Sequence, residues 1–258
     1  MAFAKQDYIA VFDSGLGGIS VLRHLMRVMP GERYLYYGDC ANAPYGSRST
    51  AEVRELTMAA VEYLLRNYPI KALVVACNTA TAAAIAHLRA IYPELIVIGI
   101  EPALKLAADR YPGGSIGVMA TQVTLREEKF HNLWQRFAAG CQVYPIEAPG
   151  LVELVESGRE NSPEAYELLE RILSPYKGGL DALVLGCTHY PFAEAAVAAV
   201  LGEKTALLDG GDGTARETRR RLVAADLLAE PTQAGDLQIR CSGDETKFVP
   251  LAQKLLKR

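Results

Sequence analysis

Two short stretches of the sequence place a cysteine directly after an apolar run. "ALVVACNTAT" carries Cys77 and "ALVLGCTHYP" carries Cys187, and polar residues follow each cysteine. A thiol with an ordinary pKa of about 8.5 can serve as acid or as base near neutral pH. Two thiols on opposite faces of one carbon could remove a proton from one face and deliver a proton to the other. The repeated pattern therefore favours inversion of a stereocentre by proton transfer.

Residues beside the two cysteines suit this chemistry. His189 follows Cys187 by two positions and could exchange a proton with that thiol or orient it. Asp13 ends an earlier apolar run and could do the same beside Cys77. Three polar residues open the helices expected after the cysteines and could bind a carboxylate: Asn78, Thr79 and Thr188.

The elements that must position these residues alternate along the chain. Eight short apolar runs predict strands, at residues 8–15, 33–39, 71–78, 95–102, 115–122, 141–149, 181–188 and 205–211. Amphipathic segments between them predict helices, one of which begins at Ser49 with Glu52 three positions later. Buried strands that alternate with helices indicate an α/β fold with mainly parallel sheets covered by helices on both faces.

The two halves of this pattern look like diverged copies. "IAVFDS" at 9–14 matches "IGVMAT" at 116–121, and a cysteine-bearing run follows each at a similar distance. We therefore expect two pseudo-symmetric, doubly wound lobes, the first formed by 1–99 plus 209–258 and the second by 100–208. Ligands of open parallel sheets bind beyond the carboxyl ends of the strands. We expect the active site in a cleft between the lobes, lined by strand-end residues that include Thr121.

Composition excludes several other classes of protein. The net charge of −3 does not suggest a nucleic-acid partner, and the short basic run at 216–222 is interpreted as the solvated face of a helix. The start of the chain lacks the apolar core of a signal peptide and no run is long enough to cross a membrane, so we expect a cytoplasmic protein. Five cysteines without a C-x-x-C pair predict free thiols and no metal site.

Four motifs, in order and spacing across nearly the whole chain, resemble those of the glutamate racemases, within the cofactor-independent aspartate/glutamate racemase family. They are "DSGLGGISVL", "GDCANAPYGSRS", "ACNTATA" and "LGCTHYPF". The resemblance implies interconversion of L- and D-glutamate without a cofactor, which supplies D-glutamate for peptidoglycan synthesis. It also implies a homodimer.

The resemblance further implies roles for individual residues. Cys77 would take the proton from the D-isomer and Cys187 from the L-isomer, with Asp13 and His189 assisting. The substrate contacts that it implies are Asp13, Ser14, Tyr45, Gly46, Asn78, Thr79, Thr188 and His189.

The chain departs from the family pattern at two places. The family has an apolar-Pro-apolar stretch that ends in an assisting glutamate, whereas this chain reads "LVELVESG". Glu156 is placed as that glutamate, with Glu153 as its competitor. Cys40 stands in "GDCANAPYG" where another residue is usual, while Cys141 and Cys241 are interpreted as packing residues.

Other functions stay open at this level. A racemase of the same group could act on aspartate or another small acid. A two-lobed binding protein would bind a small molecule without turnover, but it would not need two strand-end cysteines. A cysteine hydrolase could use Cys187 with His189, which would leave Cys77 without a role. "GLGGIS" is a poor nucleotide-binding motif, because Ser20 stands where a third glycine is expected.

Overall fold

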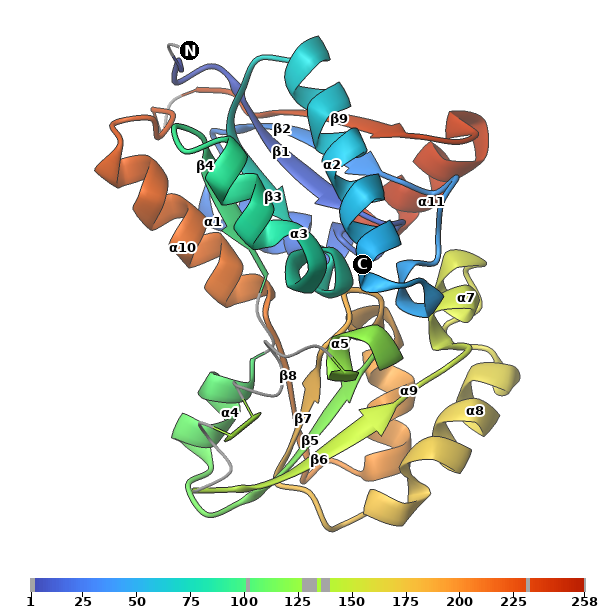
Figure 1. Ribbon diagram of the computed structural model, residues 1–258. Helices are drawn as coiled ribbons and strands as arrows, with labels where there is room; N and C mark the ends of the chain where they lie inside the picture. Colours follow the sequence, from blue (N-terminus) through green and yellow to red (C-terminus); the bar gives the residue numbers. More distant parts are fainter. Residues whose placement is uncertain (1–2, 101–102, 127–133, 136–139, 231–232, 258) are drawn as a thin grey trace. The chain divides into compact units, whose positions relative to one another are not determined.

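The chain folds into two compact units, shown in the computed structural model of Figure 1. The structure describes residues 3–100, 103–126, 134–135, 140–230 and 233–257. Unit 1 comprises Met1–Ile100 and Gly211–Arg258, and unit 2 comprises Glu101–Gly210. The last segment of the chain thus belongs with the first hundred residues.

Unit 1 is built on a parallel sheet of five strands in the order β4-β3-β1-β2-β9. The strands are β1 (Tyr8–Asp13), β2 (Arg33–Gly38), β3 (Ile70–Val75), β4 (Ile96–Gly99) and β9 (Asp236–Cys241). Every residue of β1 and β3 is buried, as expected for central strands that are covered on both faces.

Helices cover both faces of this sheet (Figure 1). They are α1 (Ile19–Val28), α2 (Thr50–Asn67), α3 (Asn78–Ile91), α10 (Gly211–Ala224) and α11 (Glu245–Leu256), with a short 3-10 helix η1 (Tyr45–Ser47). On one face, α2 and α3 share an apolar core with β1, β2 and β3. On the other, α1 packs against α10 and α11, and the Tyr36 ring of β2 stacks on Phe248 of α11.

Unit 2 contains a parallel sheet of four strands in the order β6-β5-β7-β8. The strands are β5 (Ser115–Ala120), β6 (Gln142–Glu147), β7 (Ala182–Leu185) and β8 (Ala206–Asp209). Its helices are α4 (Leu104–Arg110), α5 (Gln122–Arg126), α7 (Leu151–Glu156), α8 (Pro163–Leu173) and α9 (Glu194–Leu201), with 3-10 helices η2 (Ser174–Tyr176) and η3 (Tyr190–Ala193). One face of the sheet packs on α7, α8 and α9, and the other on α4.

The two sheets repeat one strand order. If the strands of each unit are numbered as the chain enters them, the order fourth-third-first-second describes β4-β3-β1-β2 and also β8-β7-β5-β6. The expected α/β architecture of two parallel sheets with flanking helices is confirmed, and all eight expected strands are present. The structure adds a ninth strand, β9, which no apolar run predicted.

Candidate active site

Three neighbouring strands of unit 1 bring their carboxyl ends together. The backbone N–H of Asp39 donates to the carbonyl of Asp13 at 2.9 Å, so the chain leaving β2 stays beside the end of β1. On the other side, the N–H of Ala76 donates to the carbonyl of Phe12 at 2.8 Å. The residues that follow β1, β2 and β3 therefore form one polar edge, as the parallel topology requires.

Asp13 is fully buried at this edge. Its Oδ1 accepts a hydrogen bond from the backbone N–H of Gly15 at 2.9 Å, which shapes the turn into α1. A Cβ on Gly18 would lie 2.7 Å from the Asp13 Cβ, so the start of α1 can approach the carboxylate only because residue 18 is glycine. Asp13 thus shapes the turn into α1, and its carboxylate is also buried, as expected of a functional group.

Cys77 lies at the N-terminus of α3 and is 5% exposed. Its Sγ accepts a hydrogen bond from the backbone N–H of Ala80 at 3.4 Å, and lies 3.6 Å from the Ser14 Oγ. A helix N-terminus carries partial positive charge and donors directed outward, both of which favour a thiolate. The fold therefore places this thiol where its deprotonated form is stabilised.

The two residues after Cys77 are buried polar residues. Thr79 is 3% exposed, and Asn78 is 7% exposed. No partner in the described part of the chain donates to the Asn78 Oδ1. A buried acceptor without a donor is costly, so its position indicates a group that binds from outside the chain.

Tyr45 belongs to η1 and is 1% exposed, next to the half-buried Gly46. Its hydroxyl donates to the Asp39 Oδ2 at 2.6 Å, while the Asn42 side-chain amide donates to the same carboxylate at 3.0 Å. Burial and the Asp39 carboxylate raise the pKa of Tyr45 far above its ordinary value. Asp39 was not among the expected site residues, although its place directly after β2 is a signal similar to that of Asp13 at the end of β1.

In unit 2, His189 bridges two other candidate residues. Its Nδ1 lies 3.7 Å from the Cys187 Sγ, and its Nε2 lies 2.6 Å from the Glu156 Oε1. Burial disfavours the charged imidazolium, but hydrogen bonds to Cys187 and Glu156 outweigh that cost and hold the pKa of His189 well above 6.5. The three side chains form a continuous hydrogen-bonded chain from thiol to carboxylate.

The geometry distinguishes the two glutamates of α7. Glu156, in the last turn, reaches His189, because α7 packs on η3, which begins one residue after that histidine. Glu153 is exposed. Behind Cys187, the buried Tyr190 has a pKa well above 10, raised by burial and by the nearby thiol.

The remaining candidates also follow strands. Thr188 is buried beside Cys187, and Thr121 follows β5 and accepts a hydrogen bond from the N–H of Thr124 at 3.4 Å. Cys40, Cys141 and Cys241 are partly exposed, in contrast to the buried Cys77 and Cys187.

The described residues show neither a metal-binding cluster nor a membrane-spanning helix. They contain no group of three or more His, Cys, Asp or Glu side chains that could hold a metal ion. Among the helices that the structure describes, none is both long and apolar enough to cross a membrane.

Comparison with known proteins decides the family. The family model for Asp/Glu/hydantoin racemases matches residues 18–218. The chain belongs to the Asp/Glu/hydantoin racemase family. It is 44% identical to a glutamate racemase of Clostridium perfringens over 98% of this chain and 97% of that protein.

Solved structures of glutamate racemases are similar to this chain over nearly its full length. A glutamate racemase isoform of Bacillus anthracis matches with a TM-score of 0.88 and 33% identity, covering 98% of this chain and 95% of that one. The Escherichia coli glutamate racemase, in complex with L-glutamate and the activator UDP-MurNAc-Ala, matches with a TM-score of 0.86 and 33% identity over 97% of this chain and 95% of that one.

Proposed function

We propose that this racemase interconverts L- and D-glutamate by two-base proton transfer between Cys77 and Cys187. The observation that carries the proposal is the equivalent placement of the two thiols. Each follows the third strand of its unit, β3 or β7, in sheets of the same strand order. The choice of glutamate as substrate rests on the similarity to glutamate racemases over nearly the full length of the chain.

In the proposed reaction, one cysteine acts as thiolate and the other as thiol. Cys77 removes the α-proton of D-glutamate while Cys187 delivers a proton to the opposite face, and the roles reverse for L-glutamate. The N-terminus of α3 favours the Cys77 thiolate, whereas the charged His189 favours that of Cys187. Asp13 assists on the first side, and Glu156 holds the His189 imidazolium on the second.

The α-proton of an amino acid is a very weak acid, so the protein must stabilise the charge that develops on the carboxylate. Backbone N–H groups at the start of α3 are suited to that task, because they need no reorganisation as the charge grows. The unpartnered Asn78 Oδ1 would accept a hydrogen bond from the substrate ammonium. The other residues proposed to contact the substrate are Asp13, Ser14, Tyr45, Gly46, Thr79, Thr121, Thr188 and His189.

The cellular role extends this proposal. D-glutamate made by the enzyme would serve peptidoglycan synthesis in the cytoplasm. A homodimer without a nucleic-acid partner stays a prediction.

The two-base mechanism is tested by removing one thiol at a time. Cys77→Ala should abolish racemisation, yet Cys187 should still remove the α-proton of a β-chloro analogue of L-glutamate. Once the carbanion forms, chloride leaves, so the second thiol is not needed. Cys187→Ala should show the reverse preference, for the D-analogue. Chloride release from each enantiomer, together with circular dichroism of glutamate, measures both effects.

Substantial racemisation by either variant would refute the two-cysteine assignment. Elimination without enantiomer preference would do the same. Parallel assays with aspartate test the choice of substrate. If the enzyme racemises aspartate faster than glutamate, aspartate becomes the proposed substrate. Wild-type enzyme should also place solvent deuterium at the α-carbon of glutamate, which neither a binding protein nor a hydrolase would do.

A further inference from the structure

A second pair of cysteines meets at the edge of the unit 1 sheet. Cys241 ends β9, and its partner in the parallel register is Gly38, the last residue of β2. Cys40 follows Gly38 by two positions. Two hydrogen bonds join the segments beyond the strands: the N–H of Ser242 donates to the Gly38 carbonyl at 3.0 Å, and the N–H of Ala41 donates to the Ser242 Oγ at 3.0 Å.

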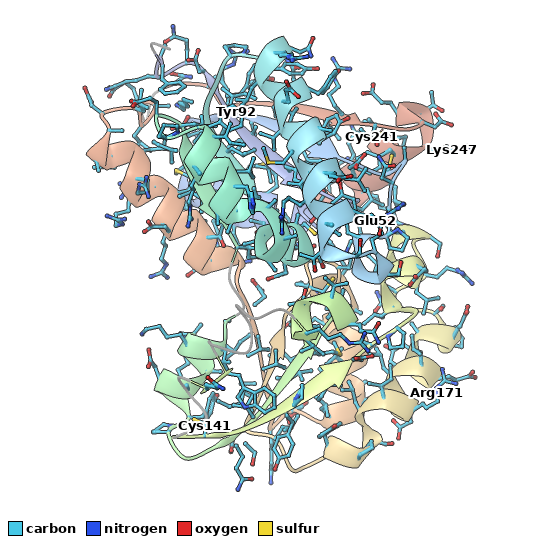
Figure 2. The ribbon with its side chains drawn as sticks, viewed as in Figure 1. Glu52, Tyr92, Cys141, Arg171, Cys241 and Lys247 are labelled. Carbon is cyan, nitrogen blue, oxygen red and sulfur yellow. The ribbon has the colours of Figure 1, made fainter. Side chains whose placement is uncertain are left out.

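Both sulfurs lie against the same glycine. A Cβ on Gly243 would lie 2.9 Å from the Cys40 Sγ, so that sulfur rests on the glycine backbone. Cys40 and the Gly243 backbone also act on the Cys241 thiol: the nearby Cys40 thiol raises its pKa, and the Gly243 N–H lowers it. Both cysteines are partly exposed, so small thiol reagents can reach them (Figure 2 labels Cys241).

From this geometry we infer that Cys40 and Cys241 form a redox-active dithiol, which low-molecular-weight disulfides such as oxidised glutathione convert to an intramolecular disulfide. The pairing of Cys241 with Gly38, the hydrogen bonds beyond the strand ends and the contact of the Cys40 sulfur with Gly243 bring the two cysteines to one turn, as a disulfide requires. The cross-link would fasten the start of the loop that carries Tyr45 to the edge strand β9. The inference does not depend on the proposed racemisation.

The two thiols have different roles in the thiol–disulfide exchange with oxidised glutathione. Burial and the Cys40 thiol raise the pKa of Cys241 to about 12. Cys40 therefore attacks the small disulfide as thiolate, and one glutathione leaves as a thiol. Cys241 then loses its proton to solvent base and attacks the Cys40 sulfur, which releases the second glutathione. The protein is oxidised by two electrons and the reagent is reduced by two, and closure accelerates as the pH rises.

The test incubates the folded chain with oxidised glutathione and then alkylates the remaining thiols in denaturant. The number of alkylated thiols should fall from the five free cysteines to three, and unreduced peptide maps should show Cys40 linked to Cys241. Dithiothreitol should restore all five. Closure measured at pH 7 and pH 9 should be faster at pH 9.

Three variants isolate the pair. Cys40→Ser and Cys241→Ser should each abolish the cross-link, while thermal unfolding confirms that both variants are folded. Cys141→Ser is the matched control, because Cys141 is also partly exposed but lies in unit 2, where Figure 2 labels it. The inference fails if glutathione stays attached to Cys40 without closure, if the linked peptides contain other cysteines, or if Cys241→Ser still loses two thiols.

Discussion

The Cys187 thiol and the Glu156 carboxylate bind opposite ring nitrogens of His189. Both partners favour the charged ring and raise the pKa of His189. Because His189 is 3% exposed, water screens these interactions weakly, and each partner therefore has a large effect on the others. The protonation of the ring beside Cys187 thus depends on Glu156, the carboxylate at the opposite ring nitrogen.

Glu156→Gln tests this coupling. Loss of the carboxylate should lower the pKa of His189 towards 6.5, so the imidazolium should lose its proton at lower pH than in the wild type. A fall of one unit in that pKa would reduce kcat by about ten-fold at pH values well above both the wild-type and the variant pKa, and the alkaline limb of the kcat profile should move to lower pH. Racemisation rates from pH 6 to pH 10 measure this effect.

Glu153→Gln is the control, because Glu153 is an exposed carboxylate on the same helix. It should leave both kcat and the pH profile close to those of the wild type. Equal profiles for the two variants would show that Glu156 has no special coupling to His189.

At the level of single elements, α2 begins with a capping box. Ser49 accepts a hydrogen bond from the N–H of Glu52 at 3.3 Å, and the Glu52 carboxylate accepts one from the N–H of Ser49 at 2.9 Å. This capping box begins two residues after η1, so it fixes where the loop that carries Tyr45 turns into a helix. Figure 2 labels Glu52 at this end of α2.

Ser49→Ala should destabilise unit 1 by about 1 kcal/mol, because an N–H at the start of α2 loses its acceptor. Urea unfolding measures the change, with Ser47→Ala as a control, since Ser47 is an exposed neighbour that does not cap the helix. If the two variants unfold at the same urea concentration, the capping box contributes nothing measurable.

At the scale of the whole molecule, a buried ion pair joins distant parts of the chain within unit 1. The Lys71 Nζ in β3 lies 2.6 Å from the Glu32 Oε2, and both side chains are at most 1% exposed. The same ammonium donates to the carbonyls of Lys5 and Leu227, and the other Glu32 oxygen accepts from the N–H of Ala229 at 2.8 Å. Segments before β1 and after α10 thereby meet at one charged group.

Lys71→Met should destabilise the protein by about 3–5 kcal/mol, since it leaves the Glu32 carboxylate buried without a counter-charge. Lys71→Met combined with Glu32→Gln should recover much of that loss. Both variants lack the hydrogen bonds that Lys71 donates. The difference between their free energies of unfolding in urea therefore reports the cost of the buried Glu32 charge. A double variant no more stable than the single one would contradict this account.

Eight of the nine strands that the structure describes could be predicted from the sequence, because short apolar runs that alternate with amphipathic segments are typical of strands buried in a covered sheet. The sequence also marked Asp13, Cys77 and Cys187, since polar residues directly after such runs lie at the carboxyl edge of a parallel sheet. β9 escaped prediction, because it pairs only at the sheet edge and its residues are partly exposed, so its apolar pattern is weak.

Contacts between residues far apart in the sequence could not be predicted, because they depend on how whole elements pack. Packing of α7 on η3 selected Glu156 over Glu153 as the partner of His189. The pairing of β9 with β2 brought Cys241 to Cys40. Neither contact follows from local pattern, because residue types fix what a side chain can do, whereas the packing of whole elements fixes what it touches.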